Sequence, residues 1–236
     1  RVDVMGMLWM FDWSTKLRRN RYLNECQHEV MAEYLKSDFP SGKTDYRQVD
    51  YLAADLEMTG LDAESDHILS IGFVPIINQK VVLSGAKHIL VNSELGVGQS
   101  AVSHCIHDRD IESASSLAPA IEALLQALAG KVLLLHCAQL DMAFLNRACN
   151  NLYGQNLFVP IADTMVIEEN RLHAQNGSGA IDSLRLGDCR SRYNLPDYSA
   201  HNALIDAVST AELFLAQMSY RFGAHPAALR QLLSVR

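Results

Sequence analysis

Residues 49–58 read VDYLAADLEM, an apolar stretch that carries the carboxylates Asp55 and Glu57 near its end. The residues around them are mostly leucine and alanine, which predicts a strand in the middle of a sheet. Side chains alternate between the two faces of a strand, so Asp55 and Glu57 should point the same way. Two carboxylates on one buried face repel each other unless a cation compensates them. The alternative interpretation is an exposed edge strand with a polar face.

The elements expected around this strand alternate between strands and helices. Strands are predicted over 67–78 and 80–91, with the hairpin connection at Asn78 and Gln79, then over 131–137 and, more weakly, 158–163. Helices are predicted over 118–130, 140–152 and about 181–193, 203–219 and 225–234, with a flexible loop at the polar stretch 173–180. This order predicts an α/β fold, a mixed β-sheet flanked by α-helices.

Three segments are expected along the 236 residues. Residues 1–47 form an N-terminal helical arm that ends at the breakers in FPSGKTD, residues 48–222 form the main domain, and residues 223–236 form a C-terminal helix packed on it. No apolar run is long enough to span a membrane, and the start of the chain does not resemble a secretory signal. The five cysteines, an odd number without a CxxC pair, predict reduced thiols in a cytoplasmic protein.

Three more residues have types and positions that suit metal-dependent chemistry. Asp141 follows the predicted strand 131–137 within the start of a helix, where the helix dipole favours a carboxylate. Simple helix capping would explain Asp141 equally well. His201 and Asp206 are five residues apart, and they can converge if His201 lies in a loop and Asp206 in the first turns of a helix that begins near Ala203. An isolated histidine there would be an ordinary polar loop residue.

Together these residues suit cleavage of a phosphodiester bond. Mg²⁺ and Mn²⁺ prefer oxygen ligands, and a pair of such ions can hold the attacking and leaving oxygens of an in-line displacement. A histidine can accept a proton near neutral pH. The net charge of −7 argues against a nucleic-acid partner, but cations bound by the carboxylates would reverse the local sign. The basic run KLRRNR in the arm is interpreted as a solvated helix face.

Three segments resemble the motifs of the DEDDh class of 3′→5′ exonucleases, which includes the DnaQ-like proofreading (epsilon) subunit of bacterial DNA polymerase III. They are DLEMTGL, HCAQLDMAFL and AHNALIDAVSTAELFL, and the resemblance covers about residues 50–217. The third is the most specific, because the histidine five residues before the aspartate separates this class from a tyrosine-containing one. SHCIHD resembles a further short stretch of the family, and Asp163–Thr164 resembles a pair with a structural role.

The resemblance implies a ribonuclease-H-like fold, two divalent cations (Mg²⁺ or Mn²⁺) and release of nucleoside 5′-monophosphates from a 3′ end. By motif position, the metal ligands would be Asp55, Glu57, Asp141 and Asp206, and the general base would be His201. The residues beside the terminal nucleotide would be Met58, Thr59, Leu61 and His104. Cys137 and Leu140 depart from the family's usual asparagine and phenylalanine, which affects substrate fit more than catalysis.

Several alternatives stay open at this point. The leading hypothesis is an exonuclease acting on single-stranded DNA ends, but DLEMTGL is also the form found in oligoribonucleases, so RNA is an alternative substrate. A third hypothesis is a module that docks onto a DNA polymerase or another partner through the arm or the C-terminal helix. A zinc site from His104, Cys105, His107, His136 and Cys137 matches no common ligand spacing. The sequence does not define the oligomeric state.

Overall fold

A computed structural model describes residues 16–92, 114–176, 183–198 and 201–234 of the chain. Within this part, six strands form one mixed sheet. Five of them follow the order β3-β2-β1-β5-β6, and the sixth, β4, also pairs with β2. The strands are β1 (Tyr51–Met58), β2 (Ile68–Ile77), β3 (Lys80–Val81), β4 (Lys87–Leu90), β5 (Val132–Leu135) and β6 (Ile161–Asp163). β1 is central, antiparallel to β2 and parallel to β5. The predicted mixed sheet is therefore confirmed.

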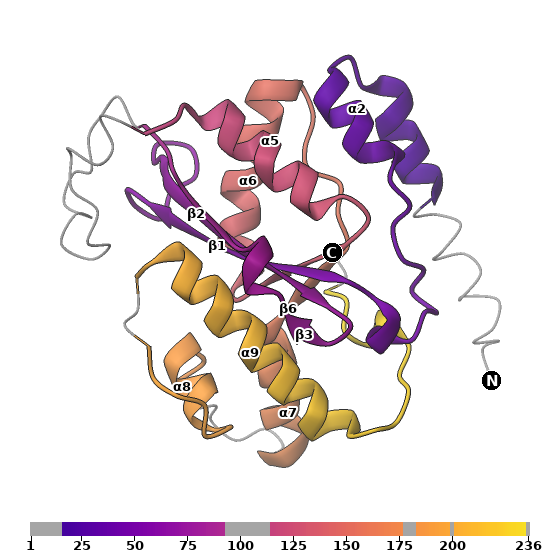
Figure 1. The fold of residues 1–236 in the computed structure, drawn as a ribbon, viewed down its shortest axis with the longest axis vertical. Coiled ribbons are helices and arrows are strands. Elements are labelled where there is room, and N and C mark those ends of the chain that lie inside the picture. The colour runs from indigo at the N-terminus through magenta and orange to yellow at the C-terminus, as the bar shows by residue number, and fades with distance from the viewer. Residues whose placement is uncertain (1–15, 93–113, 177–182, 199–200, 235–236) are drawn as a thin grey trace.

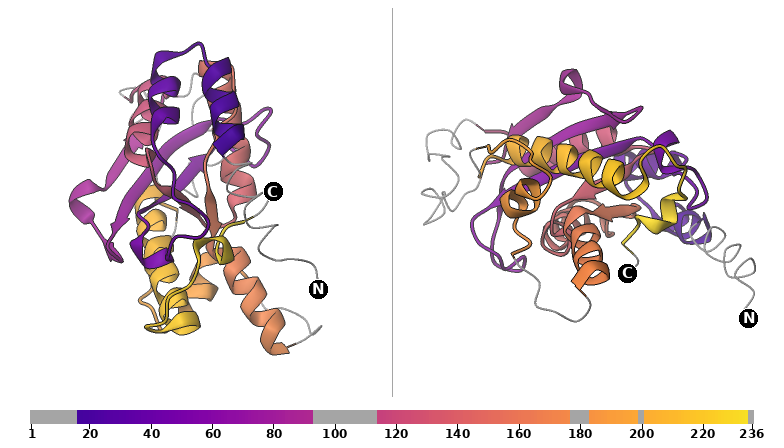
Figure 2. Two further views of the ribbon diagram at one scale, coloured as in Figure 1. Left: turned by 90° about the vertical axis from the view of Figure 1, so that its right-hand side faces the viewer. Right: turned by 90° about the horizontal axis from the view of Figure 1, so that it is seen from below.

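Helices cover both faces of the sheet (Figures 1 and 2). One face carries α2 (Glu29–Lys36), α5 (Leu117–Leu128) and α6 (Ala138–Tyr153), and the other carries α7 (Thr164–Asn176), α8 (Leu186–Ser191) and α9 (Ala203–Phe222). Residues 16–25 are also helical, and short 3₁₀ turns lie at Tyr46–Gln48, Leu83–Gly85 and Leu229–Gln231. No helix in the described ranges is both long and apolar enough to cross a membrane.

The side chains of β1 alternate between two hydrophobic cores. Leu52 and Leu56 belong to the core beneath α5 and α6, whereas Tyr51 and Ala53 belong to the core beneath α9. The same alternation continues to the end of the strand, so Asp55 and Glu57 lie on the α9 face. The prediction that these two carboxylates share one face of a central strand is confirmed.

Two expectations between 80 and 180 need correction. The single strand predicted over 80–91 is broken into β3, a 3₁₀ turn and β4, because the chain turns closely over Pro75 of β2, to whose carbonyl the N–H of Val82 donates. The loop predicted over 173–180 is helical in its first part, since α7 continues through Asn176. The missed helix is only weakly amphipathic, so apolar periodicity gave no signal for it.

The prediction of a C-terminal helix within residues 223–236 is wrong. The described part of this tail contains one 3₁₀ turn, Leu229–Gln231. The N–H groups of Leu229 and Arg230 donate to the carbonyls of Thr44 (2.8 Å) and Gly42 (2.9 Å), and the N–H of Ser234 donates to Ile161 (2.9 Å). Backbone donors that a helix would use internally are therefore bound by the arm and by β6, while Leu229 and Leu232 still become buried.

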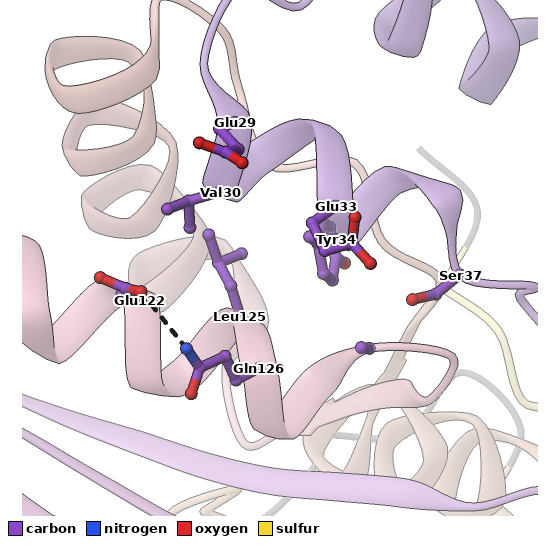
Figure 3. Close-up of a pocket in the computed structure, with 9 residues that line it drawn as sticks. Glu29, Val30, Glu33, Tyr34, Ser37, Glu122, Leu125 and Gln126 are labelled. Carbon is purple, nitrogen blue, oxygen red and sulfur yellow. Dashed lines mark hydrogen bonds between the residues drawn. The ribbon is translucent and has the colours of Figure 1, made fainter.

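The N-terminal arm shares the hydrophobic core of the main domain. Met31 and Leu35 of α2 are fully buried beside α5, and the Tyr34 hydroxyl donates to the carbonyl of Phe158 at 3.0 Å. A surface groove of about 610 Å³ lies between α2 and α5. Figure 3 shows the side chains that line it, among them Glu29 and Glu122. This groove lies on the face of the sheet opposite α9, away from Asp55 and Glu57.

Candidate active site

The site begins at the end of β1, where Asp55 and Glu57 face α9. Glu57 is 4% exposed, and Asp55 is partly exposed. The pairing of β1 with β2 shifts register between Glu57 and Met58, which marks an irregularity of the kind often found beside active sites. One carboxylate oxygen from each of Asp55, Glu57 and Asp206 lies within 4.8 Å of the other two. The structure thus brings together three of the four predicted metal ligands as one cluster.

Gly72 lets α9 come close enough to complete this cluster. It pairs with Asp55 across the β1–β2 ladder, and a β-carbon on Gly72 would collide with the backbone of Ala203, the first residue of α9. A glycine inside a strand often marks such a close approach of another backbone. The start of α9 therefore lies directly on the sheet beside Asp55, which places Asp206 over the strand. The sequence analysis did not identify Gly72, although a glycine within ILSIGFVP was a usable signal.

His201 and Asp206 have the predicted arrangement, with the histidine before the helix and the aspartate in its first turns. Asn202 caps α9, because its side chain accepts from the N–H groups of Leu204 and Ile205, both at 3.1 Å. The N–H of His201 donates to Oδ2 of Asp206 at 2.9 Å. His201 is exposed, and its φ of 70° lies in the left-handed region that non-glycine residues seldom occupy.

Asp141 reaches the same strand from α6. β5 pairs with β1 only from Tyr51 to Ala53, so the edge of β1 beyond Ala53 faces the start of α6. The backbone N–H of Leu56 donates to the Asp141 carboxylate, which places this carboxylate at β1 between Asp55 and Glu57. Asp141 is 4% exposed and interacts electrostatically with Asp55 and Glu57, although it is outside the three-residue cluster.

Asp163 holds the start of α6 in place. Its carboxylate, at the end of β6, accepts from the N–H groups of Cys137 (3.2 Å), Ala138 (2.9 Å) and Met165 (2.9 Å). Cys137 precedes α6 with a φ of 69°, a conformation that asparagine adopts more readily than cysteine. Asp163 therefore satisfies N–H groups at the N-terminus of α6 and fixes the turn that carries Asp141.

Burial disfavours the ionised form of every carboxylate in the site, and repulsion adds to this effect at Asp55, Glu57 and Asp141. Burial, then the charges of Asp141, Asp206 and Glu57, raise the pKa of Asp55 well above its ordinary range. Burial followed by the charge of Asp206 raises the pKa of Glu57 to about 8, and burial followed by the charge of Asp163 raises the pKa of Asp141 to about 8. Burial also raises the pKa of Asp206, against the opposing effect of the His201 N–H. Such a set of oxygen donors fits a divalent cation, whose charge would favour all four ionised forms.

The loop after β1 presents an exposed apolar side chain. Leu61 is 77% exposed, and the loop around it is held by hydrogen bonds. The Thr59 hydroxyl donates to Asp66 at 3.0 Å and accepts from the N–H of His67, while Arg147 of α6 donates to the carbonyls of Ala63 and Asp66. Met58, the last residue of β1, is almost completely buried. His104, also expected at the terminal nucleotide, lies outside the described residues.

The zinc alternative receives no support from the residues that the structure describes. The ring nitrogens of His136 interact with the Thr164 hydroxyl (2.8 Å) and the Leu184 carbonyl (2.9 Å). Burial lowers the pKa of His136, so the ring is neutral at neutral pH. His136 is therefore a buried histidine whose ring nitrogens both have hydrogen-bond partners.

A mixed sheet with carboxylates gathered at the end of its central strand is the arrangement expected of exonucleases with a ribonuclease-H-like fold. The chain belongs to the exonuclease family RNase_T, whose family model matches residues 52–214. The resemblance to DnaQ-like exonucleases that the three motifs indicated is thereby confirmed.

The named relatives that the chain resembles include DNA polymerase III proteins and a 3′-5′ exonuclease DinG of Staphylococcus haemolyticus. A DNA polymerase III subunit epsilon-like protein of Rhodobacter capsulatus is 30% identical over 177 residues, which are 73% of this chain and 24% of that protein. DNA polymerase III subunit epsilon of Treponema pallidum is 26% identical over 175 residues, 74% of this chain and 79% of that protein. The chain thus spans about a quarter of the Rhodobacter protein, and 12% of a PolC-type DNA polymerase III of Thermotoga petrophila.

Solved structures confirm the fold. Exonuclease X, in complex with 5′ overhanging duplex DNA, has a TM-score of 0.58 at 18% identity, covering 77% of this chain and 98% of that chain. The nuclease domain of 3′hExo, a DEDDh family member bound to rAMP, has a TM-score of 0.60 at 13% identity, covering 78% and 98%. The ribonuclease-H-like fold expected from the resemblance is therefore present.

Replacing Gly72 by alanine should separate α9 from β1. Because the added methyl group would collide with the Ala203 backbone, we expect Asp206 to move away and Mn²⁺ affinity to fall at least tenfold, with about 1–3 kcal/mol lost from the free energy of unfolding. Isothermal titration with Mn²⁺ and chemical denaturation would measure the two effects. The control is Gly187→Ala in α8, where a methyl group meets nothing within 4 Å and alanine favours the helix. Wild-type Mn²⁺ affinity in Gly72→Ala would contradict this role.

In the presence of EDTA, stability should decrease as pH rises from about 5 to 8. Glu57 and Asp141 keep their protons in the folded protein up to about pH 8, whereas the unfolded chain releases them near pH 4. The folded state binds more protons in this window, so the free energy of unfolding falls with pH, as thermal denaturation would measure. Asp55→Asn should reduce this decrease, and Mn²⁺ should raise the melting temperature more at pH 8 than at pH 6. A pH-independent melting temperature in EDTA would contradict the electrostatic description.

Proposed function

We propose that this protein is a metal-dependent 3′→5′ exonuclease that hydrolyses phosphodiester bonds at the 3′ end of DNA and releases nucleoside 5′-monophosphates. The observation that carries the proposal is the meeting of Asp55, Glu57 and Asp206, whose carboxylate oxygens lie within 4.8 Å of one another. Asp141 lies at the same strand. Membership of the exonuclease family supports the same class of reaction.

The four carboxylates are proposed as the ligands of two divalent cations, Mg²⁺ or Mn²⁺, because these ions prefer oxygen donors. When bound, such a pair stabilises the attacking and leaving oxygens of an in-line displacement at phosphorus. The protein's own part is to hold Asp55, Glu57, Asp141 and Asp206 at one end of β1. Their raised pKa values mean that cation binding releases protons near neutral pH.

His201 is proposed as the general base. A ring nitrogen of His201 would take a proton from the attacking water, whose oxygen forms the new bond to phosphorus. The bond from phosphorus to the 3′ oxygen of the penultimate nucleotide then breaks, and this oxygen takes a proton to become the new 3′ hydroxyl. Support for this role comes from the exposure of His201 and from its backbone bond to Asp206, which keeps the histidine beside the carboxylates.

The terminal nucleotide is proposed to lie against the loop after β1. Leu61, being 77% exposed, offers an apolar surface for a nucleobase, while Met58 and Thr59 form the base of this loop. His104 is assigned to the same role by motif position alone. The hydrogen bonds of Asp66 and Arg147 keep the loop in one shape, which favours a defined position for the strand end.

Single-stranded DNA ends are the proposed substrate, and RNA is the second candidate. Exonuclease X, with the same fold, is described in complex with duplex DNA that has a 5′ overhang, whereas 3′hExo is described with bound rAMP. The relatives named as DNA polymerase III subunits support a polymerase as a protein partner. The four described cysteines are all free, in keeping with the proposed cytoplasmic location.

Substitutions in the carboxylate set should distinguish the proposed roles. We expect Asp55→Ala and Glu57→Ala to abolish 3′-end hydrolysis, because each removes a cation ligand. His201→Ala should slow hydrolysis by about 10²–10⁴-fold, the usual contribution of a general base, while Mn²⁺ affinity is retained. Lost Mn²⁺ binding in His201→Ala would instead make the histidine a ligand.

The measurement uses oligonucleotides of one sequence, made as DNA and as RNA, labelled at the 3′ or the 5′ end and incubated with Mg²⁺, Mn²⁺ or EDTA. These arms report the polarity, the preferred sugar and the metal dependence together, since a site that uses the 2′-hydroxyl prefers RNA. Asp188→Ala, an exposed carboxylate of α8, is the matched control and should have wild-type activity. Undiminished hydrolysis by Asp55→Ala would refute the proposed function.

A further inference from the structure

Arg190 of α8 is a buried arginine that joins three parts of the chain near His201. Its side chain is 3% exposed. One terminal nitrogen, Nη1, donates to the carbonyl of Ser209 in α9 at 2.7 Å, and Nη2 donates to the carbonyl of Pro196 at 2.8 Å and to Oε2 of Glu212 at 2.9 Å. These partners satisfy Nη1 and Nη2, as a buried guanidinium requires, while Nε is buried without a hydrogen-bond partner among the described residues. Arg190 therefore attaches the segment that begins at Pro196 to the second and third turns of α9.

Tyr198 strengthens the same attachment. The guanidinium carbon of Arg190 lies 4.7 Å from the centre of the Tyr198 ring, a cation–π distance. The Tyr198 hydroxyl donates to Oε1 of Glu212 at 3.2 Å, so Glu212 accepts from both Arg190 and Tyr198. Although Tyr198 is 44% exposed, its ring is held from two sides.

The same segment is attached to α9 again at its other end. His201 follows Tyr198 by three residues, and its N–H donates to Asp206. Asn202 then caps the helix. The left-handed backbone of His201, with a φ of 70°, is a conformation that a loosely held histidine would leave. Pro196 and Tyr198 are therefore attached to α9 before His201 in the sequence, and Asp206 binds the His201 backbone itself.

We propose that Arg190 is a positioning residue for His201: by fixing Pro196 and Tyr198 on α9, it keeps the imidazole within reach of the water that attacks the 3′-terminal phosphodiester. This inference rests on the proposed function, in which His201 is the general base. In this proposal, α8 restricts the movement of the segment that carries His201. Catalysis by a positioned general base is sensitive to displacements of about 1 Å, so losing the contacts of Arg190 should lower the turnover rate.

A purely structural role for Arg190 predicts a different result. Arg171 of α7 is a comparable arginine, since it pairs with the buried carboxylate of Glu168 at 2.6 Å and hydrogen bonds to Gln175. The hydrogen-bond partners of Arg171 are on α7, and its guanidinium also lies 5.6 Å from the rings of Tyr193 and Tyr220, whereas the hydrogen bonds of Arg190 reach Pro196 in the segment that leads to His201. If both arginines act only by stabilising the fold, Arg190→Ala and Arg171→Ala should change turnover to a similar extent.

The test is a double-mutant cycle measured as 3′-end hydrolysis of labelled DNA with Mn²⁺. We expect Arg190→Ala to lower turnover about tenfold or more with KM nearly unchanged, because the segment that carries His201 is no longer fixed. Since the charge of Arg190 also opposes the rise that burial causes in the pKa of Asp206, turnover is compared at saturating Mn²⁺. In a His201→Ala background, adding Arg190→Ala should change the rate by less than about twofold, since a residue that acts through His201 has nothing left to position. Arg171→Ala should keep wild-type turnover at a temperature where it is folded.

Other outcomes would contradict this role of Arg190. If Arg190→Ala slows the His201→Ala enzyme by the same factor as it slows the wild type, or leaves the wild-type rate unchanged, Arg190 does not position His201. If His201→Ala itself has wild-type turnover, the general base of the proposed function is wrong, and the role of Arg190 is refuted with it. Arg190→Lys keeps the charge but not the forked geometry, so it serves in the same cycle if the alanine variant does not fold. It should give an intermediate loss that disappears in the His201→Ala background.

Discussion

The main constraint on this structure is the electrostatic repulsion among the carboxylates that lie together at one end of β1. Asp55, Glu57, Asp141 and Asp206 are all buried or partly buried, and the pKa of each lies above its ordinary range. A core does not tolerate such a group of like charges without compensation, because both burial and proximity penalise ionisation. Among the described residues, the N–H of Leu56 opposes the rise in the pKa of Asp141, and the N–H of His201 and the charge of Arg190 oppose that of Asp206, which offsets part of this penalty. The remaining charge is balanced by protons or, in the proposed function, by divalent cations.

Despite this repulsion, the surrounding elements fix the carboxylates where helices meet the sheet. The missing side chain of Gly72 allows the start of α9 to lie on β2 beside Asp55. Asp163 caps α6 and so fixes Asp141, and Arg190 attaches the segment before α9 to that helix. None of these three residues is in the carboxylate cluster, yet each determines where one of its members or neighbours lies. A scaffold that fixes the ligands in advance limits the reorganisation needed when cations and substrate bind.

Several predictions from local patterns are confirmed, whereas the strand over 80–91 and the C-terminal helix fail because contacts outside the segment decide the backbone there. Alternation in residues 49–58 places Asp55 and Glu57 on one face, and the apolar repeat after Asn202 predicts where α9 begins, because both follow from backbone periodicity. The C-terminal tail has a helical pattern, but the carbonyls of the arm accept its N–H groups, a competition that no local pattern contains. The proposed grouping of Asp141 with the others came from family resemblance. A strand glycine such as Gly72 indicates that some backbone approaches closely, but not which one.

The central claim is that residues far apart in sequence form one cation site, and its most direct test is anomalous X-ray scattering from crystals soaked in Mn²⁺. The account predicts anomalous peaks bounded by the carboxylates of Asp55, Glu57 and Asp206, with Asp141 turned toward one of them. These peaks should disappear from crystals of Asp55→Asn grown under the same conditions. Peaks confined to other acidic surfaces, such as the glutamates between α2 and α5, or an Asp141 that faces away from β1, would contradict the account.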